Sequence, residues 1–173
     1  MDDFFQKVTN MQDPFRKLVG YIPGFGGYVQ RENRRDADKL LRDTVARRFN
    51  EQWQRVSQLQ SDLVSNGMIA YVDDVEKAAL KLRTFIDKLS TAPRGYSGLF
   101  DAVKINEKEL EAIYQFDAAF FDLADQISHA VDNLEQTMND EAALPAAIRN
   151  LTSLARLAVE TYEKRSEAVT GSK

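Results

Sequence analysis

Asp117 is the residue whose surroundings in the sequence most suggest chemistry, because it is the one polar member of an apolar series. The other members, at steps of three and four residues, include Leu110, Ile113, Phe120, Ala124 and Ile127. A carboxylate among such neighbours on a helix would be buried, and a buried carboxylate needs a partner or a shifted pKa. Counting along antiparallel helices places Tyr162 and Arg165 near it, and counting from the starts of two parallel helices places Arg42 there. We interpret this polar cluster as an ion pair that fixes helix register, with a ligand pocket as the alternative.

His129 is the second candidate, because Asp125 and Asp132 lie four residues before it and three after it. On a helix the three side chains share a face, as metal ligands or a carboxylate-oriented imidazole would. The chain has 1 histidine and 0 cysteines, so a di-iron bundle with a histidine on each of two helices and any thiolate site are excluded. We therefore expect a surface histidine, with no metal site, no cofactor and no catalytic residue.

An arginine-rich run could bind phosphates or anionic lipid. It comprises Arg31, Arg34, Arg35, Lys39, Arg42, Arg47 and Arg48. Acidic residues are interleaved with it, and the segment 107–139 is strongly acidic, so pairing within the molecule is an equal explanation. The glycines of residues 24–27 follow no strand and lack the Lys-Ser/Thr of a phosphate loop, so the sequence does not support nucleotide binding.

The elements that must position these residues are helices. Apolar residues recur at alternating steps of three and four in four segments, which run from about Val29 to Asn66, from Met68 to about Leu89, over 107–139, and from Leu144 to beyond Tyr162. Asn66-Gly67 is typical of a left-handed C-terminal cap. No alternation typical of strands is present. The sequence predicts an all-α fold, an antiparallel up-down four-helix bundle over residues 29–173 with a short helical N-terminal extension over residues 1–28.

This topology brings two loops, residues 22–28 and 92–100, to the same end of the bundle. Both contain glycine and aromatic residues, and loops of such composition often bind partners. The candidate partner-binding residues are Phe25, Tyr28, Arg94, Tyr96 and Phe100. The alternative is that these side chains fill the core where the first long helix extends past the next. The opposite end has only tight links.

Composition narrows the function without naming it. With 23 basic and 27 acidic residues, the net charge of −4 argues against a nucleic-acid binder. The first residues lack the features of a secretory signal, so we expect a cytoplasmic location. We predict a non-enzymatic bundle that acts through protein–protein contacts or self-association, as an adaptor or assembly subunit, with no small-molecule substrate. The alternatives are peripheral membrane association through residues 1–22, and last a small-ligand binder built on the Asp117 cluster.

Overall fold

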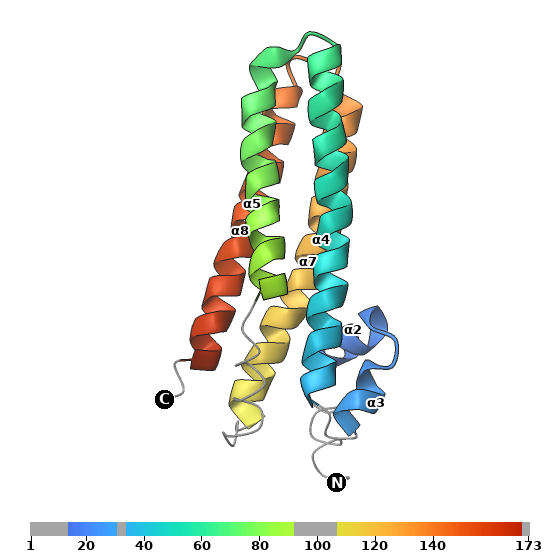
Figure 1. Ribbon diagram of the computed structural model, residues 1–173, viewed down its shortest axis with the longest axis vertical. Coiled ribbons are helices and arrows are strands. Elements are labelled where there is room, and N and C mark those ends of the chain that lie inside the picture. Colours follow the sequence, from blue (N-terminus) through green and yellow to red (C-terminus); the bar gives the residue numbers. More distant parts are fainter. Residues whose placement is uncertain (1–13, 31–33, 92–106, 171–173) are drawn as a thin grey trace.

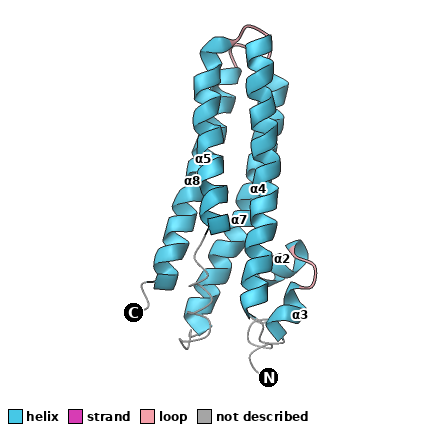
Figure 2. Ribbon diagram, in the orientation of Figure 1, coloured by secondary structure: helices cyan, strands magenta, loops and turns pink. Residues whose placement is uncertain are grey.

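The computed structural model describes residues 14–30, 34–91 and 107–170. Four long helices form the bundle, namely α4 (Arg34–Ser65), α5 (Val72–Thr91), α7 (Glu107–Thr137) and α8 (Leu144–Thr170). They run alternately up and down (Figure 1), and the described part of the chain contains helices and turns but no strand (Figure 2). The predicted all-α, antiparallel four-helix bundle is confirmed.

The predicted apolar stripes face inward and form one core. Helices α4 and α8 each pack against both α5 and α7, so each long helix has two neighbours. Phe85 of α5 lies at the centre of an aromatic group, with its ring 4.3 Å from that of Phe49, 5.3 Å from that of Phe120 and 6.4 Å from that of Tyr162. Because these rings come from all four long helices, burial of Phe85 couples the whole bundle.

The two turns at the upper end of the bundle are closed by local hydrogen bonds. Gly67 adopts φ +73°, and the amides of Gly67 and Met68 donate to the carbonyls of Val64 and Leu63. This is a Schellman motif, and it confirms the left-handed cap predicted at Asn66-Gly67. The short 3-10 helix η1 (Ile69–Tyr71) then leads into α5. At the second turn, the Asp140 carboxylate accepts hydrogen bonds from two backbone amides just before α8.

Helix α5 is the shortest of the four, with 20 residues against 32 in α4, 31 in α7 and 27 in α8. It therefore ends before the lower ends of its neighbours, and only three long helices continue below it (Figure 1). Among the described long helices, α4, α7 and α8 are therefore the ones that can contribute polar groups at that level.

The described part of the N-terminal extension forms two short helices, α2 (Pro14–Tyr21) and α3 (Phe25–Gln30). Pro14 is the first residue of α2, as predicted. They lie beside the lower half of α4, away from α5 and α8 (Figure 1), with α2 packed on α7 and α3 on α4.

The first long helix departs from its predicted start. We expected it to begin at about residue 29, but residues 29 and 30 belong to α3 and the described part of α4 begins at Arg34. Residues 25–27, expected in a loop, are also helical. Gly24, at φ +82°, makes the turn between α2 and α3, and burial of Phe25 outweighs the poor helix propensity of Gly26 and Gly27.

The outward faces of the long helices are charged. Neighbouring turns are joined by exposed pairs such as Lys77–Asp74, Arg83–Asp87 and Arg156–Glu160. No helix in the described ranges is long and apolar enough to cross a lipid bilayer.

Candidate functional site

The polar cluster predicted around Asp117 exists, and its centre is an ion pair between α7 and α8. Asp117 and Arg165 are 2% and 3% exposed. The Arg165 Nε donates to Oδ1 of Asp117 at 2.5 Å, and its second nitrogen donates to Oδ2 at 3.3 Å. This fork-to-fork geometry is the strongest arrangement of these two groups, because two parallel hydrogen bonds add to the charge attraction.

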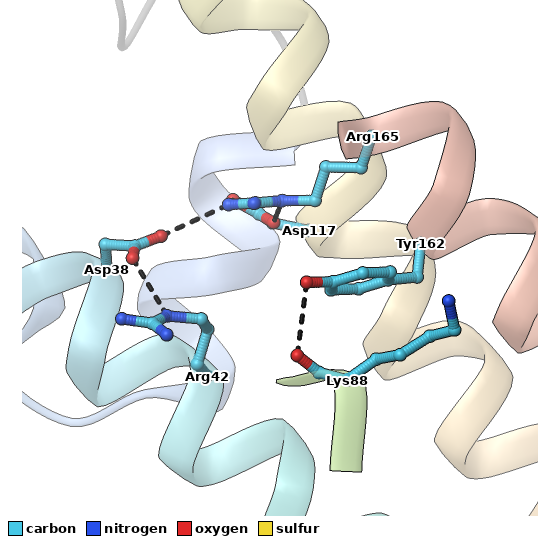
Figure 3. Close-up of polar contacts among 6 residues, drawn as sticks. All are labelled: Asp38, Arg42, Lys88, Asp117, Tyr162 and Arg165. Carbon is cyan, nitrogen blue, oxygen red and sulfur yellow. Dashed lines mark hydrogen bonds and ion pairs between the residues drawn. The ribbon is translucent and has the colours of Figure 1, made fainter. Parts of the chain in front are cut away.

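A second aspartate extends the pair to α4. The Arg165 guanidinium also donates to Asp38 at 3.2 Å, and the other oxygen of Asp38 accepts from Arg42 Nε at 2.9 Å (Figure 3). Asp38 and Arg42 are largely covered. We call Asp38, Arg42, Asp117 and Arg165 the buried network. Its two acidic and two basic groups join α4, α7 and α8 just beyond the end of α5.

The position of Asp117 changes its acidity. Burial raises its pKa to about 6, because loss of water around the carboxylate outweighs the attraction and hydrogen bonds of Arg165. Asp38 adds to the rise and Arg42 opposes it. At neutral pH the Asp117 carboxylate is therefore mostly ionised, in keeping with its pairing with Arg165. It takes up a proton at a higher pH than an exposed aspartate would.

Tyr162, which we expected in this cluster, lies beside the buried network (Figure 3). Its hydroxyl donates to the backbone carbonyl of Lys88 at 3.1 Å (Figure 3). Lys88 lies in the last turn of α5, where carbonyls lack partners within the helix, and a tyrosine from the neighbouring helix satisfies this one. Asp38, which the sequence analysis did not name, is the fourth member of the buried network. The sequence signal was present, since Asp38 is spaced four residues from Arg42, but we expected that pair only to support its own helix.

The buried network is chemically complete. Among the side chains that the structure describes, no buried nitrogen or oxygen lacks a hydrogen-bond partner. An active site usually keeps a polar group ready for its ligand, whereas here each carboxylate oxygen already accepts from an arginine. The buried network therefore links three helices through hydrogen bonds that occupy all four of its carboxylate oxygens.

The two aspartates that flank His129 in the sequence form exposed ion pairs with arginines of α4. His129 is exposed, as predicted. Its neighbour Asp125 pairs with Arg48 at 3.2 Å, and Asp132 pairs with Arg55 at 2.6 Å. Within the described ranges, no group of three or more acidic or histidine side chains could hold a metal ion. Two described arginines of the run form ion pairs with other residues of this chain: Arg42 in the buried network and Arg48 in an exposed pair with Asp125.

Of the five candidate partner-binding residues, only Phe25 has a described side chain, and it is buried. Phe25 is only 2% exposed, and its ring lies 5.9 Å from that of Phe15 and 6.3 Å from that of Tyr114. It fills the core between α3 and α7, which is the alternative that the sequence left open. Arg94, Tyr96 and Phe100 lie outside the described residues, as does the side chain of Tyr28.

The most exposed large apolar residues near one another lie at the opposite end, which we had treated as bare. Ile69 is 67% exposed and Val64 is 53% exposed, on either side of the Gly67 turn. We call these two residues the apolar tip. A signal existed in the sequence: both are large and apolar, yet both fall outside the apolar stripes and so have no place in the core.

The comparisons with known proteins identify no relative. No family model, no curated protein and no solved structure matches this chain.

Proposed function

We propose that the protein is a non-enzymatic helical bundle that acts through protein–protein contacts, as an adaptor or assembly subunit, and that the apolar tip is its contact surface. The observation that supports this most directly is the exposure of Ile69, the highest among the large apolar residues of the described ranges, together with that of Val64 on the other side of the same turn. Single exposed apolar residues are ordinary, but two that flank one tight turn are suited to contact with a partner.

The apolar tip has no evident role in folding. The turn is held by backbone hydrogen bonds and by Gly67, and the core beneath it is filled by Leu63 and by partly buried Met68 and Tyr71. Side chains that contribute little to stability yet stay apolar at a projecting turn suit contact with another protein. A patch of this size is smaller than a stable interface needs, so we expect a weak or transient contact unless neighbouring surface joins it.

The experiment is site-specific photo-crosslinking in cells, with a photoreactive amino acid in place of Ile69. The matched control places it at Leu80, which is 59% exposed on the outer face of α5. We expect a discrete crosslinked protein from position 69 that position 80 does not give, and its loss when Val64→Ser is added. Identical products at both positions, or none at either, would contradict the proposal. Sedimentation velocity separates self-association from a different partner.

The other two functions remain weaker proposals. A small-ligand site in the buried network would need a free polar group, and its carboxylate oxygens are already occupied. Membrane association through residues 1–22 would require α2 to leave the bundle, because Phe15, Leu18 and Ile22 are buried there. Liposome sedimentation with and without residues 1–22 tests it. The proposal keeps the cytoplasmic location predicted from the sequence, which cell fractionation would test.

A further inference from the structure

The α2–α3 segment is a hairpin whose helices depend on docking. They contain 8 and 6 residues. Isolated helices shorter than roughly 12–15 residues are marginal in water, so neither would persist alone. Four apolar side chains anchor the hairpin, Phe15, Leu18, Ile22 and Phe25, each 4% exposed or less. Folding of this segment and its attachment to the long helices are therefore one event.

The hairpin covers an aromatic surface of α7. Tyr21 stacks flat on Phe121, with ring centroids 4.7 Å apart and planes 6° apart, and Phe15 packs 5.8 Å from Tyr114. Phe121 is 0% exposed in this state. Release of the hairpin would remove its stacking partner and bring aromatic surface into contact with water, which is unfavourable unless another apolar side chain replaces it.

Polar contacts surround this aromatic surface. Lys17 pairs with Asp122 at 3.2 Å, and the Tyr21 hydroxyl donates to Asp125 at 3.0 Å. Asp125 also pairs with Arg48 of α4, whose guanidinium lies 4.9 Å from the centroid of the Tyr21 ring. Hydrogen bonding to Asp125, followed by burial, raises the pKa of Tyr21, which keeps the hydroxyl protonated as the donor.

These polar contacts are suited to selecting a ligand rather than holding it permanently. Lys17 and Asp122 are 47% and 44% exposed, and exposed ion pairs contribute little to stability. The long helices, in contrast, are joined by the buried network and by a core that spans all four. The described ion pair that attaches the hairpin to α7 is thus an exposed one, and the surface beneath the hairpin has a defined pattern of aromatic and acidic groups.

We propose that this surface is a helix-binding site and that the α2–α3 hairpin is its displaceable intramolecular occupant. We call the surface the docking face, made of Tyr114, Phe121, Asp122 and Asp125 of α7 with Arg48 of α4. Its external ligand is an amphipathic helix of a partner protein that repeats the α2 spacing, an aromatic residue followed by lysine, leucine and tyrosine two, three and six positions later. Asp122 selects the basic residue by charge complementarity, and Asp125 accepts a hydrogen bond from the tyrosine. The docking face is separate from the apolar tip and does not depend on it.

The first test measures how readily the hairpin opens. The chain has 0 cysteines, so Leu18→Cys provides a single buried thiol on α2, and Leu151→Cys provides a matched control in α8. Both leucines are 0% exposed. We expect a thiol reagent to label position 18 at least roughly 100-fold faster than position 151, since local opening requires less free energy than global unfolding. Equal rates in two variants with the same melting temperature would overturn the proposal.

The second test measures binding in trans. A fluorescent peptide of residues 14–30 is titrated into the full chain carrying Leu18→Asp, which removes a hairpin anchor and leaves the docking face intact. We expect saturable binding, at least about 10-fold weaker to the wild-type chain because its own hairpin competes. The same peptide with Lys17→Glu should bind more weakly at low salt, since that change places a carboxylate against Asp122.

Three outcomes would overturn the assignment. The peptide could fail to bind a Leu18→Asp chain that keeps wild-type helicity. The substitution could instead unfold the four long helices, in which case the hairpin is an integral part of the core. Finally, sedimentation could show wild-type chains exchanging hairpins as a dimer, which would make a second copy the occupant in place of a partner protein.

Discussion

Different interactions hold the two ends of the bundle together. The upper end has short turns, a glycine cap at Gly67 and an apolar interior, and its two exposed apolar residues lie outside the core. At the lower end α5 stops early, and the buried network joins the three remaining helices. Apolar packing can be repaired by small movements, whereas a buried ion pair has one geometry. The comparison teaches that charged groups link the helices at the lower end, whereas backbone caps and apolar packing close the upper end.

The largest expected effect comes from removing the centre of the buried network. Arg165→Ala leaves Asp117 and Asp38 without their shared partner, and breaking a buried pair in this way costs about 3–5 kcal/mol of unfolding free energy. Arg156→Ala on the same helix is the control, because its pair with Glu160 is exposed, and it should change stability by under about 0.5 kcal/mol. Urea unfolding measures both. Equal losses would remove the contrast between buried and exposed charge.

The pH dependence of stability provides the next test of the lower end. The folded-state pKa of Asp117 is raised to about 6, so the folded protein holds a proton that the unfolded chain releases near pH 4. Its contribution to stability is therefore fully present below about pH 4 and is lost as the pH rises through about 6. Against Asp117→Asn, which does not titrate there, wild type should lose up to about 3 kcal/mol between pH 4 and 7.

Urea unfolding of both proteins at several pH values gives this difference directly, and other titrating groups cancel in the comparison. A difference that does not change with pH, or that rises with pH, would show that Asp117 is not held in the environment described.

The glycine cap tests the upper end. Gly67→Ala places a side chain at φ +73° and should cost about 1 kcal/mol, because only glycine adopts this conformation without strain. Gly20 is a control, since its backbone has no positive φ and a Cβ there would meet nothing within 4 Å. Gly20→Ala should be neutral or slightly stabilising. Thermal melts would compare the two, and a larger loss at Gly20 would contradict this description of the turn.

The smallest expected effect concerns the exposed charges between α4 and α7. Arg55 pairs with Asp132 at 2.6 Å and with Glu135 at 2.8 Å, a geometry as short as that in the buried network. The pairs are nonetheless exposed to water and salt, so Arg55→Ala should cost only about 0.5–1 kcal/mol, less at high salt. Chemical denaturation at low and high salt measures this. A loss as large as that of Arg165→Ala would show that burial does not distinguish the two groups.

The sequence predicted the helices well because an amphipathic helix has apolar residues at regular spacing along the chain. The spacing of apolar residues identified all four long helices and their inner faces, and Asn66-Gly67 identified the turn after the first. Asp117 was recognised as buried for the same reason, since its position in the stripe fixes its direction from the helix axis. Arg165 followed from counting residues along two antiparallel helices, and Arg42 from counting along two parallel ones.

Partner choice required the tertiary structure. A stripe fixes where a side chain points but not which atom of a neighbouring helix it meets. The sequence could therefore not decide that Arg165 reaches Asp38 as well as Asp117, or that Tyr162 turns to the Lys88 carbonyl. The same holds for Phe25, whose glycine-rich surroundings predict a loop, yet whose burial against Phe15 and Tyr114 makes the segment helical. Periodicity along one chain determined the helices, and packing between helices decided which of their side chains form a network, fill the core or stay exposed.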